Sequence, residues 1–281
     1  KVCRDVNRAG ADAVIVADLG IARLFRDVAP TLPLHASTQM TVHNLDGAKH
    51  LASLGFTRAV LARELSYEDI KSICKNSPIE LEVFVHGALC VSESGLCLFS
   101  SFLGGKSANR GMCTQACRRF YTAEVPGGTK QGYYFSPCDL QLIDQIPNLI
   151  QAGVDSFKIE GRMKSAEYVG NVVAAYRYVI DHWQEDKKGV VAAGKRMLSA
   201  DFARSKTTYW YGFNSNKDAQ EQVSSKILNP NQAGGTGIYL GKISATKPAS
   251  KELIEADRKN SSNDEDNNSN MIQLATLTGG A

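Results

Sequence analysis

The chain has 281 residues, of which 43% are hydrophobic, and a formal net charge of +3. This length can bury the core of one large domain or of two ordinary ones, and so mild a charge does not by itself indicate nucleic-acid binding. No run of about 18 apolar residues predicts a membrane-spanning helix. The sequence shows neither a signal-peptide pattern nor an initiating Met, and we expect a cytoplasmic protein.

Short apolar strands alternate with amphipathic helices from the start of the chain. We predict strands over residues 13–17, 34–37, 59–62, 81–85 and 156–159. We predict helices over residues 21–28, 44–54, 66–74, 140–151 and 166–183. Ser66, with Asp69 three residues later, is a good N-cap for the third of these helices. This alternation favours parallel βαβ units.

The predicted strands are too few for a closed barrel. Five clear strands precede residue 160, whereas a closed (β/α) barrel needs eight. We therefore predict, by analogy with that fold, a TIM-like parallel α/β barrel over residues 1–188 that lacks about three βα units at its N-terminus. An open α/β sheet is the alternative.

The pattern changes after the predicted barrel. Residues 189–233 form a mixed, polar connecting region. Residues 234–281 begin a small β-rich module, and MIQLATLTGG at its end contains one more possible strand. A charged, Asn- and Ser-rich segment over residues 247–270 interrupts this module, and its composition predicts disorder.

A cysteine-rich insertion over residues 87–138 follows the strand at 81–85. It contains Cys90, Cys97, Cys113 and Cys117, with Cys138 as a fifth candidate ligand at its end. In a cytosolic protein, an odd total of seven cysteines favours metal binding or catalysis over disulfides. The C-x2-C knuckle typical of structural zinc is missing, whereas iron–sulfur clusters accept more varied spacings. An iron–sulfur cluster is therefore favoured, with zinc or reduced structural thiols as alternatives.

Polar residues follow the predicted strands, where parallel α/β proteins bind their ligands. They are Asp18, Ser37, Thr38, Gln39, Arg63, Glu64, His86, Glu160 and Arg162. The motif KIEGRMKS also places Lys158 and Lys164 around the start of a helix. Because cations near a helix N-terminus favour anions, this motif predicts an anion site. A plain Glu160–Arg162 surface pair is the alternative.

Peptidase chemistry has weaker support in the sequence. There is no G-x-S-x-G elbow and no H-E-x-x-H helix. Cys90 lies four residues after His86 and could act as a nucleophile. However, the sequence pattern offers no acid to orient the histidine, and clustered cysteines are more typical of ligands.

Several motifs together resemble one known family. EVFVHGALCVSESGLCLFSS, HASTQ, NRGMCTQACRR, SPCDLQLIDQIP, GVDSFKIEGRMKS and GGTGIYLGKI are similar, in the same order, to motifs of the collagenase-like peptidase family of unassigned catalytic type, peptidase family U, number thirty-two. The resemblance covers roughly residues 11–243. It implies a barrel-like N-terminal domain preceded by three further βα units, and a small C-terminal β-barrel.

The resemblance also implies a chemistry. Better-understood members of this family are oxygen-independent hydroxylases of a tRNA uridine, a ribosomal RNA cytidine or a quinone precursor. The resemblance to these members implies a [4Fe–4S] cluster held by Cys90, Cys97, Cys113 and Cys117. It also implies prephenate as the hydroxyl source, as in several of these members. Some relatives draw the fourth ligand from a position near Cys138, so Cys138 is an alternative to Cys117. The polar segment after Lys247 departs from the family pattern.

The leading hypothesis is therefore an iron–sulfur enzyme that hydroxylates RNA, with a tRNA uridine as the best candidate and prephenate as co-substrate. A peptidase or collagenase is one alternative, and a non-catalytic cluster subunit of a quinone-pathway hydroxylase is another. A chain that lacks three βα units could also be inactive.

The leading hypothesis assigns roles to individual residues. We expect His86, Glu160 and Gln39 to be catalytic, and Arg63, Lys158, Arg162 and Arg118 to bind substrate. Phosphate contacts are expected from Arg110, Arg118, Arg119, Arg162 and Lys164. The aromatic residues Phe120, Tyr121 and Tyr133 either stack on bases or form the small core of the insertion.

Overall fold

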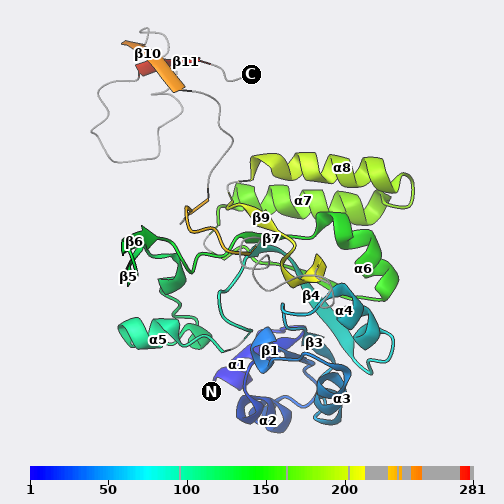
Figure 1. Ribbon diagram of the computed structural model, residues 1–281. Helices are drawn as coiled ribbons and strands as arrows, with labels where there is room; N and C mark the ends of the chain where they lie inside the picture. Colours follow the sequence, from blue (N-terminus) through cyan, green and yellow to red (C-terminus); the bar gives the residue numbers. More distant parts are fainter. Residues whose placement is uncertain are drawn as a thin grey trace. The chain divides into compact units, whose positions relative to one another are not determined.

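The computed structural model describes residues 1–94, 96–162, 164–201, 203–212, 227–232 and 234–235, and the backbone of residues 242–248 and 273–278. The chain divides into two compact units, residues 1–237 and residues 238–281. The first unit contains the main sheet, its helices and the cysteine-rich insertion (Figure 1).

The main sheet is mixed but mostly parallel. Its seven strands are β1 (Val14–Val16), β2 (Leu34–Ala36), β3 (Arg58–Val60), β4 (Glu80–Ala88), β7 (Asp139–Gln141), β8 (Ser156–Ile159) and β9 (Lys206–Thr207). The order is β1-β2-β3-β4-β7-β9, and β8 also pairs with β4. All of these pairs are parallel except β4–β7. The predicted parallel α/β architecture is therefore confirmed.

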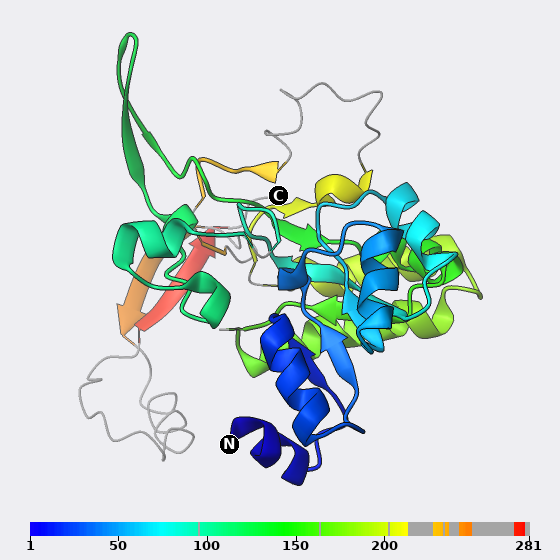
Figure 2. The same ribbon diagram turned by 90° about the horizontal axis from the view of Figure 1, so that it is seen from below.

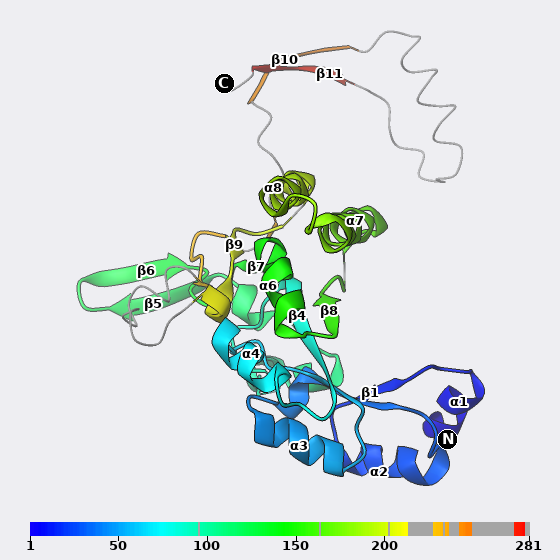
Figure 3. The same cartoon turned by 90° about the vertical axis from the view of Figure 1, so that its right-hand side faces the viewer.

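Helices connect and cover these strands. They are α1 (Val2–Arg8), α2 (Leu19–Val28), α3 (Leu45–Ser53), α4 (Tyr67–Cys74), α6 (Ile146–Ala152), α7 (Ala166–His182) and α8 (Lys187–Met197). Helices α7 and α8 pack side by side (Figures 1 and 3). The helices bury apolar side chains such as Phe25, Leu51, Ile73 and Val179 in one continuous core.

Local capping explains where several helices begin. The Asp18, Asn44 and Ser165 side chains accept hydrogen bonds from backbone N–H groups in the first turns of α2, α3 and α7. Ser66 and Asp69 form the full capping box at the start of α4, as their spacing predicts. These polar residues satisfy donors that the first turn of a helix leaves without partners.

The helix predicted over residues 140–151 is wrong in its first half. Asp139–Gln141 instead forms β7, which pairs with the end of β4 in the register Gly87↔Leu140. A short 3₁₀ turn over Ile143–Gln145 follows, and α6 begins only at Ile146, with Pro147 in its first turn. Tertiary strand pairing thus overrides the local helical pattern.

The closed barrel is not confirmed. Within the described residues the sheet is open, with β1 pairing only β2 and β8 pairing only β4. Large apolar side chains are exposed beside both of these strands, at Leu19 and Leu24 on α2 and at Val173 on α7. The truncated barrel therefore stays a prediction.

The cysteine-rich insertion forms a small substructure of its own. It contains α5 (Phe99–Gly104), 3₁₀ turns over Ala108–Arg110 and Ala116–Arg118, and the hairpin of β5 (Tyr121–Val125) and β6 (Gly128–Gly132). The hairpin extends well away from the sheet (Figures 2 and 3). Its turn passes through Gly127, whose φ of 98° suits glycine.

Aromatic contacts hold the insertion together. Phe99 on α5 stacks with Tyr121 of β5 at 6.2 Å between ring centroids, and Phe135 meets both rings edge-on. The Tyr121 hydroxyl also donates a hydrogen bond to the carbonyl of Ala116. Tyr121 therefore belongs to the small core of the insertion.

The second unit contains two described strands. β10 (Lys242–Pro248) and β11 (Gln273–Thr278) pair antiparallel, with an irregularity between Ile243 and Ala245. The strand expected near the end of the chain is confirmed by β11. Most of the predicted polar segment, from residue 249 onward, lies outside the described residues. In the described part of the chain, no helix has the length and apolar character needed to span a membrane.

Gly87 marks a close approach between two strands. Its φ is 109°, and a Cβ at this position would lie 2.3 Å from the carbonyl oxygen of Glu160. Both features exclude any side chain here, because the backbone conformation and the space each require glycine.

We expect Gly87→Ala to lower the free energy of unfolding by about 3 kcal/mol, from backbone strain and the steric clash. Gly170→Ala on α7 is the matched control, since nothing lies within 4 Å of its Cβ position and alanine favours helix by up to about 1 kcal/mol. Denaturant unfolding measures both variants. Equal stability of the two variants would contradict the close approach.

Candidate functional site

A cavity of about 320 Å³ lies where β4 and β8 end. The side chains that line it combine thiols with cations. They come from Arg63, Ala88, Leu89, Cys90, Ala108, Cys113, Gln115, Cys117, Arg118, Glu160, Arg162, Lys164 and Arg204. We call this space the cysteine–arginine pocket.

Strand pairing brings these distant segments together. The last residues of β4, from His86 to Ala88, pair with β7 on one side, and His86 pairs with Ile159 of β8 on the other. The insertion therefore leaves from the end of β4 and returns beside it through β7. Glu160 directly follows β8, which pairs with β4 on the other side. This matches the expectation that parallel α/β proteins place functional residues at the carboxyl ends of strands.

Four cysteines of the insertion lie within electrostatic reach of one another. Burial, with added repulsion from the nearby Cys97 and Cys117 thiols, raises the pKa of the Cys90 thiol to about 11. Burial also raises the pKa of Cys117, with added repulsion from Cys113 and Cys97. All seven cysteines are free thiols.

These thiols supply sulfur donors, the ligand type of iron–sulfur clusters and of many zinc sites. In the described residues, no three His, Cys, Asp or Glu side chains form a group that could hold a single metal ion. The backbone N–H of Gln115 donates to the Cys113 sulfur at 3.4 Å. Such N–H···S contacts support thiolate ligands.

The pocket is strongly cationic. Burial and the neighbouring Arg204 lower the pKa of Arg118 to about 10. Burial lowers the pKa of Lys164, and Arg204 and Lys206 lower it further. Since five of its described lining residues are cations and Glu160 is the one acidic residue among them, the pocket favours a small anion.

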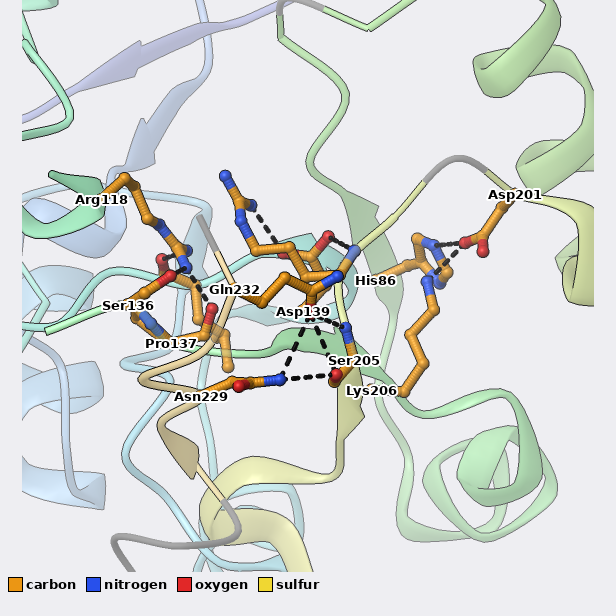
Figure 4. Close-up of polar contacts among 12 residues, drawn as sticks. His86, Arg118, Ser136, Pro137, Asp139, Asp201, Ser205, Lys206, Asn229 and Gln232 are labelled. Carbon is orange, nitrogen blue, oxygen red and sulfur yellow. Dashed lines mark hydrogen bonds and ion pairs between the residues drawn. The ribbon is translucent and has the colours of Figure 1, made fainter. Parts of the chain in front are cut away.

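Arg118 also fixes the base of the insertion. Its guanidinium donates hydrogen bonds to the Ser136 hydroxyl, to the Pro137 carbonyl and, at 2.9 Å, to the Leu89 carbonyl (Figure 4). It therefore ties the outgoing and returning segments of the insertion to each other.

A buried polar network lies next to the pocket. The His86 side chain is fully buried, with Nδ1 3.2 Å from the Tyr176 hydroxyl and Nε2 3.3 Å from Asp201 Oδ2 (Figure 4). The second contact is electrostatic, because its geometry does not make a hydrogen bond. Lys206 donates to the same Asp201 carboxylate. Both nitrogens of His86 thus face protein groups.

A second ion pair, between Arg204 and Asp139, lies in the same polar network. Asp139 is fully buried and accepts hydrogen bonds from the Arg204 backbone N–H at 3.1 Å and from its guanidinium at 2.9 Å. Sequence reasoning missed Asp139, Asp201, Arg204 and Lys206. Asp139 stands directly after Cys138 in a recognisable motif, which could have signalled it, whereas residues 201–206 carry no pattern.

The structure brings most of the predicted site residues into the pocket. Arg63, Glu160, Arg162, Arg118, Cys90, Cys113 and Cys117 line it. Cys97 is half-buried and does not line the pocket, although it lies near Cys90 and Cys117. Three further residues lie elsewhere. His86 is buried behind the end of β4, Gln39 is half-buried on a 3₁₀ turn (Thr38–Met40) after β2, and Lys158 donates to Glu82 at 2.7 Å on the sheet. Cys138 is buried beside Asp139, where the insertion returns to the sheet.

A larger cavity of about 730 Å³ lies at the opposite ends of the strands, near Pro33, Thr57 and Glu80, which adjoin or begin β2, β3 and β4. It is mixed in character and contains the thiol of Cys74. We regard the smaller pocket as the functional one, because charged and nucleophilic groups converge there.

The buried His86 predicts a pH dependence of stability. Burial lowers the pKa of His86 in the folded protein, and Lys206 adds to this effect. The unfolded chain therefore binds a proton that the folded chain excludes, and stability falls as the pH drops through about 6.5. When the pH is lowered from about 7.5 to about 5.5, we expect the free energy of unfolding to fall less in His86→Gln than in the wild type.

His50→Gln on α3 is the control, because His50 is exposed. Denaturant unfolding at the two pH values gives the comparison. An unchanged pH dependence in the His86 variant would contradict its burial as a neutral imidazole.

Comparison with known proteins places this arrangement in a family. The chain is 37% identical over 249 residues to "tRNA hydroxylation protein P1" of Bacillus subtilis, covering 85% of this chain and 58% of that protein. It is 43% identical over 196 residues to "23S rRNA 5-hydroxycytidine C2501 synthase" of Escherichia coli, covering 69% and 30%. It is 32% identical over 224 residues to "Collagenase" of Porphyromonas gingivalis, covering 73% and 53%.

The chain thus spans less than two thirds of the length of each of these relatives. Residues 1–222, which include the whole pocket, match Peptidase family U32. This match confirms the resemblance carried by the motifs around the cysteines and strand ends. The chain belongs to peptidase family U32.

Proposed function

We propose that this chain carries the active site of an iron–sulfur enzyme that hydroxylates RNA without molecular oxygen, with a tRNA uridine as the best candidate and the cytoplasm as its location. The observation that carries the proposal is the set of four neighbouring cysteines beside a pocket lined by five cations. Relatives named for tRNA and rRNA hydroxylation support it.

Cys90, Cys97, Cys113 and Cys117 would hold a [4Fe–4S] cluster. Cys117 is preferred over Cys138 as the fourth ligand, because Cys117 lines the pocket and lies near Cys97 and Cys113. The sequence lacks the short C-x2-C knuckle typical of structural zinc, which favours a cluster over zinc. When bound, such a cluster supplies electron transfer or activation of an oxygen-bearing co-substrate.

The cations of the pocket would bind a small anionic co-substrate such as prephenate. Arg63 stacks over the Phe84 ring at 4.3 Å, and its Nε is buried without a hydrogen-bond partner in the described residues. Arg162 lies at the same pocket, and its backbone N–H donates to Glu160. A carboxylate entering the pocket would satisfy the Arg63 donor by a charge-assisted hydrogen bond.

Glu160 is the pocket's acidic group and the best-placed residue to exchange a proton with a substrate. Gly87 lets the Glu160 backbone pack directly against β4. This contact fixes the position of the Glu160 backbone at the pocket. His86 would act as a positioning residue, since it contacts Tyr176 and Asp201 at the end of β4.

The peptidase alternative fits the geometry less well. A thiol peptidase needs a histidine nitrogen that faces the nucleophile. Asp201 does supply the acid that the sequence pattern lacked, but it faces Nε2 while Tyr176 faces Nδ1. In the described residues, neither nitrogen of His86 makes a hydrogen bond to Cys90. The non-catalytic quinone-pathway subunit stays a prediction.

We expect protein purified without oxygen to contain about four iron and four sulfide per chain. Cys90→Ala and Cys117→Ala should lose this iron, because each removes a ligand. Cys74→Ala is the matched control, since Cys74 is a half-buried thiol on α4. Iron and sulfide analysis with a visible absorption spectrum decides the matter. A single zinc, or unchanged iron in Cys117→Ala, would contradict the ligand set.

We expect Arg162→Gln to weaken prephenate binding roughly 10- to 100-fold, the value of a lost charge-assisted hydrogen bond. Iron content should not change, because Arg162 is not a ligand. Arg177→Gln on α7 is the control, since Arg177 is exposed and pairs with Asp181. Titration calorimetry on the iron-loaded protein measures the binding. Equal affinity in both variants would remove Arg162 from the anion site.

A further inference from the structure

The β5–β6 hairpin has two different faces. Exposure alternates along β5, with Tyr121, Ala123 and Val125 half-buried and the residues between them exposed. The Gln131 amide donates to the Thr122 hydroxyl at 3.2 Å across the hairpin. The inner face therefore packs on the insertion, and the outer face presents polar groups to solvent.

An aromatic pair stands at the base of the outer face. Phe120 and Tyr133 immediately flank the paired ends of the hairpin, where Tyr121 pairs with Gly132. Their rings meet edge-on at 5.1 Å, and Phe120 is 55% exposed. Unlike Tyr121, Phe120 thus keeps much of its surface available. The sequence analysis left both Phe120 and Tyr121 as candidates for base stacking, whereas in the structure Tyr121 belongs to the small core of the insertion and Phe120 does not.

The charge of the insertion is concentrated and positive. Residues 87–138 contain five Lys or Arg and two Glu, so the segment has the same net charge of +3 as the whole chain. Lys130 on β6 is exposed but pairs with Ala123, so it lies on the inner face of the hairpin, and the outer face carries Glu124. Arg119, which is also exposed, lies directly before Phe120. A phosphate is complementary to the Arg119 guanidinium beside the aromatic pair.

This surface connects directly to the pocket. Arg119 and Phe120 follow Cys117 and Arg118, which line the cysteine–arginine pocket. Arg118 is fixed by its hydrogen bonds to the Leu89 and Pro137 carbonyls. The aromatic pair therefore stands on a rigid base only two residues from the proposed site.

We propose that the base of the outer face of the β5–β6 hairpin binds single-stranded RNA, with Phe120 and Tyr133 stacking on bases and Arg119 contacting a phosphate. This inference rests on the proposed function and adds the means by which the RNA is held. Single-strand binders combine stacking aromatics with cations in this way. The amide and hydroxyl of Gln131 and Thr122 add hydrogen-bonding groups beside the stack.

Substitutions at Phe120 separate base stacking from simple apolar contact. We expect Phe120→Ala to bind a fluorescein-labelled tRNA anticodon stem-loop about 5- to 150-fold more weakly. Phe120→Leu, which keeps apolar surface without an aromatic ring, should be equally weak, whereas Phe120→Trp should stay within about twofold of wild type. Leu24→Ala is the control, because Leu24 is an apolar side chain of similar exposure, 50%, on α2.

Salt dependence tests the cation beside the aromatic pair. Arg119→Ala should reduce the slope of log affinity against log salt by about 0.7, whereas Lys130→Ala, on the other face of the hairpin, should reduce it less. Lys49→Ala on α3, which is also exposed, should leave the slope unchanged. All binding is measured by fluorescence anisotropy on the anaerobically purified full chain, with the cluster absorbance recorded for each variant.

Two results would overturn the inference. If Phe120→Leu and Phe120→Ala both bind RNA as the wild type does, Phe120 does not stack on a base, and the inference fails while the proposed RNA chemistry is untouched. If the wild type itself does not bind the stem-loop, both the inference and the choice of tRNA as substrate fail.

Discussion

The pairing between the end of β4 and β7 is the contact on which the site depends. It closes the cysteine-rich insertion onto the strand from which the insertion departs, with Gly87 opposite Leu140. On the other side of β4, Gly87 admits the backbone of Glu160, the residue that follows β8. Thiols, cations and a carboxylate from three segments therefore meet at one point, and Arg118 holds the two ends of the insertion together.

Much of this arrangement could be predicted from the sequence. Capping residues such as Ser66 and alternating apolar runs located α4 and β4, and the order of strands and helices indicated a parallel sheet. The helix predicted over 140–151 is wrong at its start because Leu140 pairs with β4 and is therefore in a strand. The local sequence pattern does not predict this long-range pairing. Asp201 and Lys206 were missed for the same reason, since their partner His86 is distant in the sequence.

Electrostatics gives the pocket its character. Arg118 and Lys164 are half-buried, and burial lowers the pKa of each, with added repulsion from Arg204. Asp139 pairs with Arg204 and offsets part of this charge. A bound anionic co-substrate would offset more of it. The same excess of positive charge extends over the insertion, which contains both the proposed ligands and the proposed RNA surface.

The most direct test of the central claim is nucleoside mass spectrometry of RNA from cells that lack this protein and are complemented with defined variants. We predict that wild type and Cys74→Ser restore a hydroxylated nucleoside, whereas Cys90→Ser does not. Restoration by Cys90→Ser, or no change in any nucleoside with the wild type, would contradict an RNA-hydroxylating site built on these cysteines.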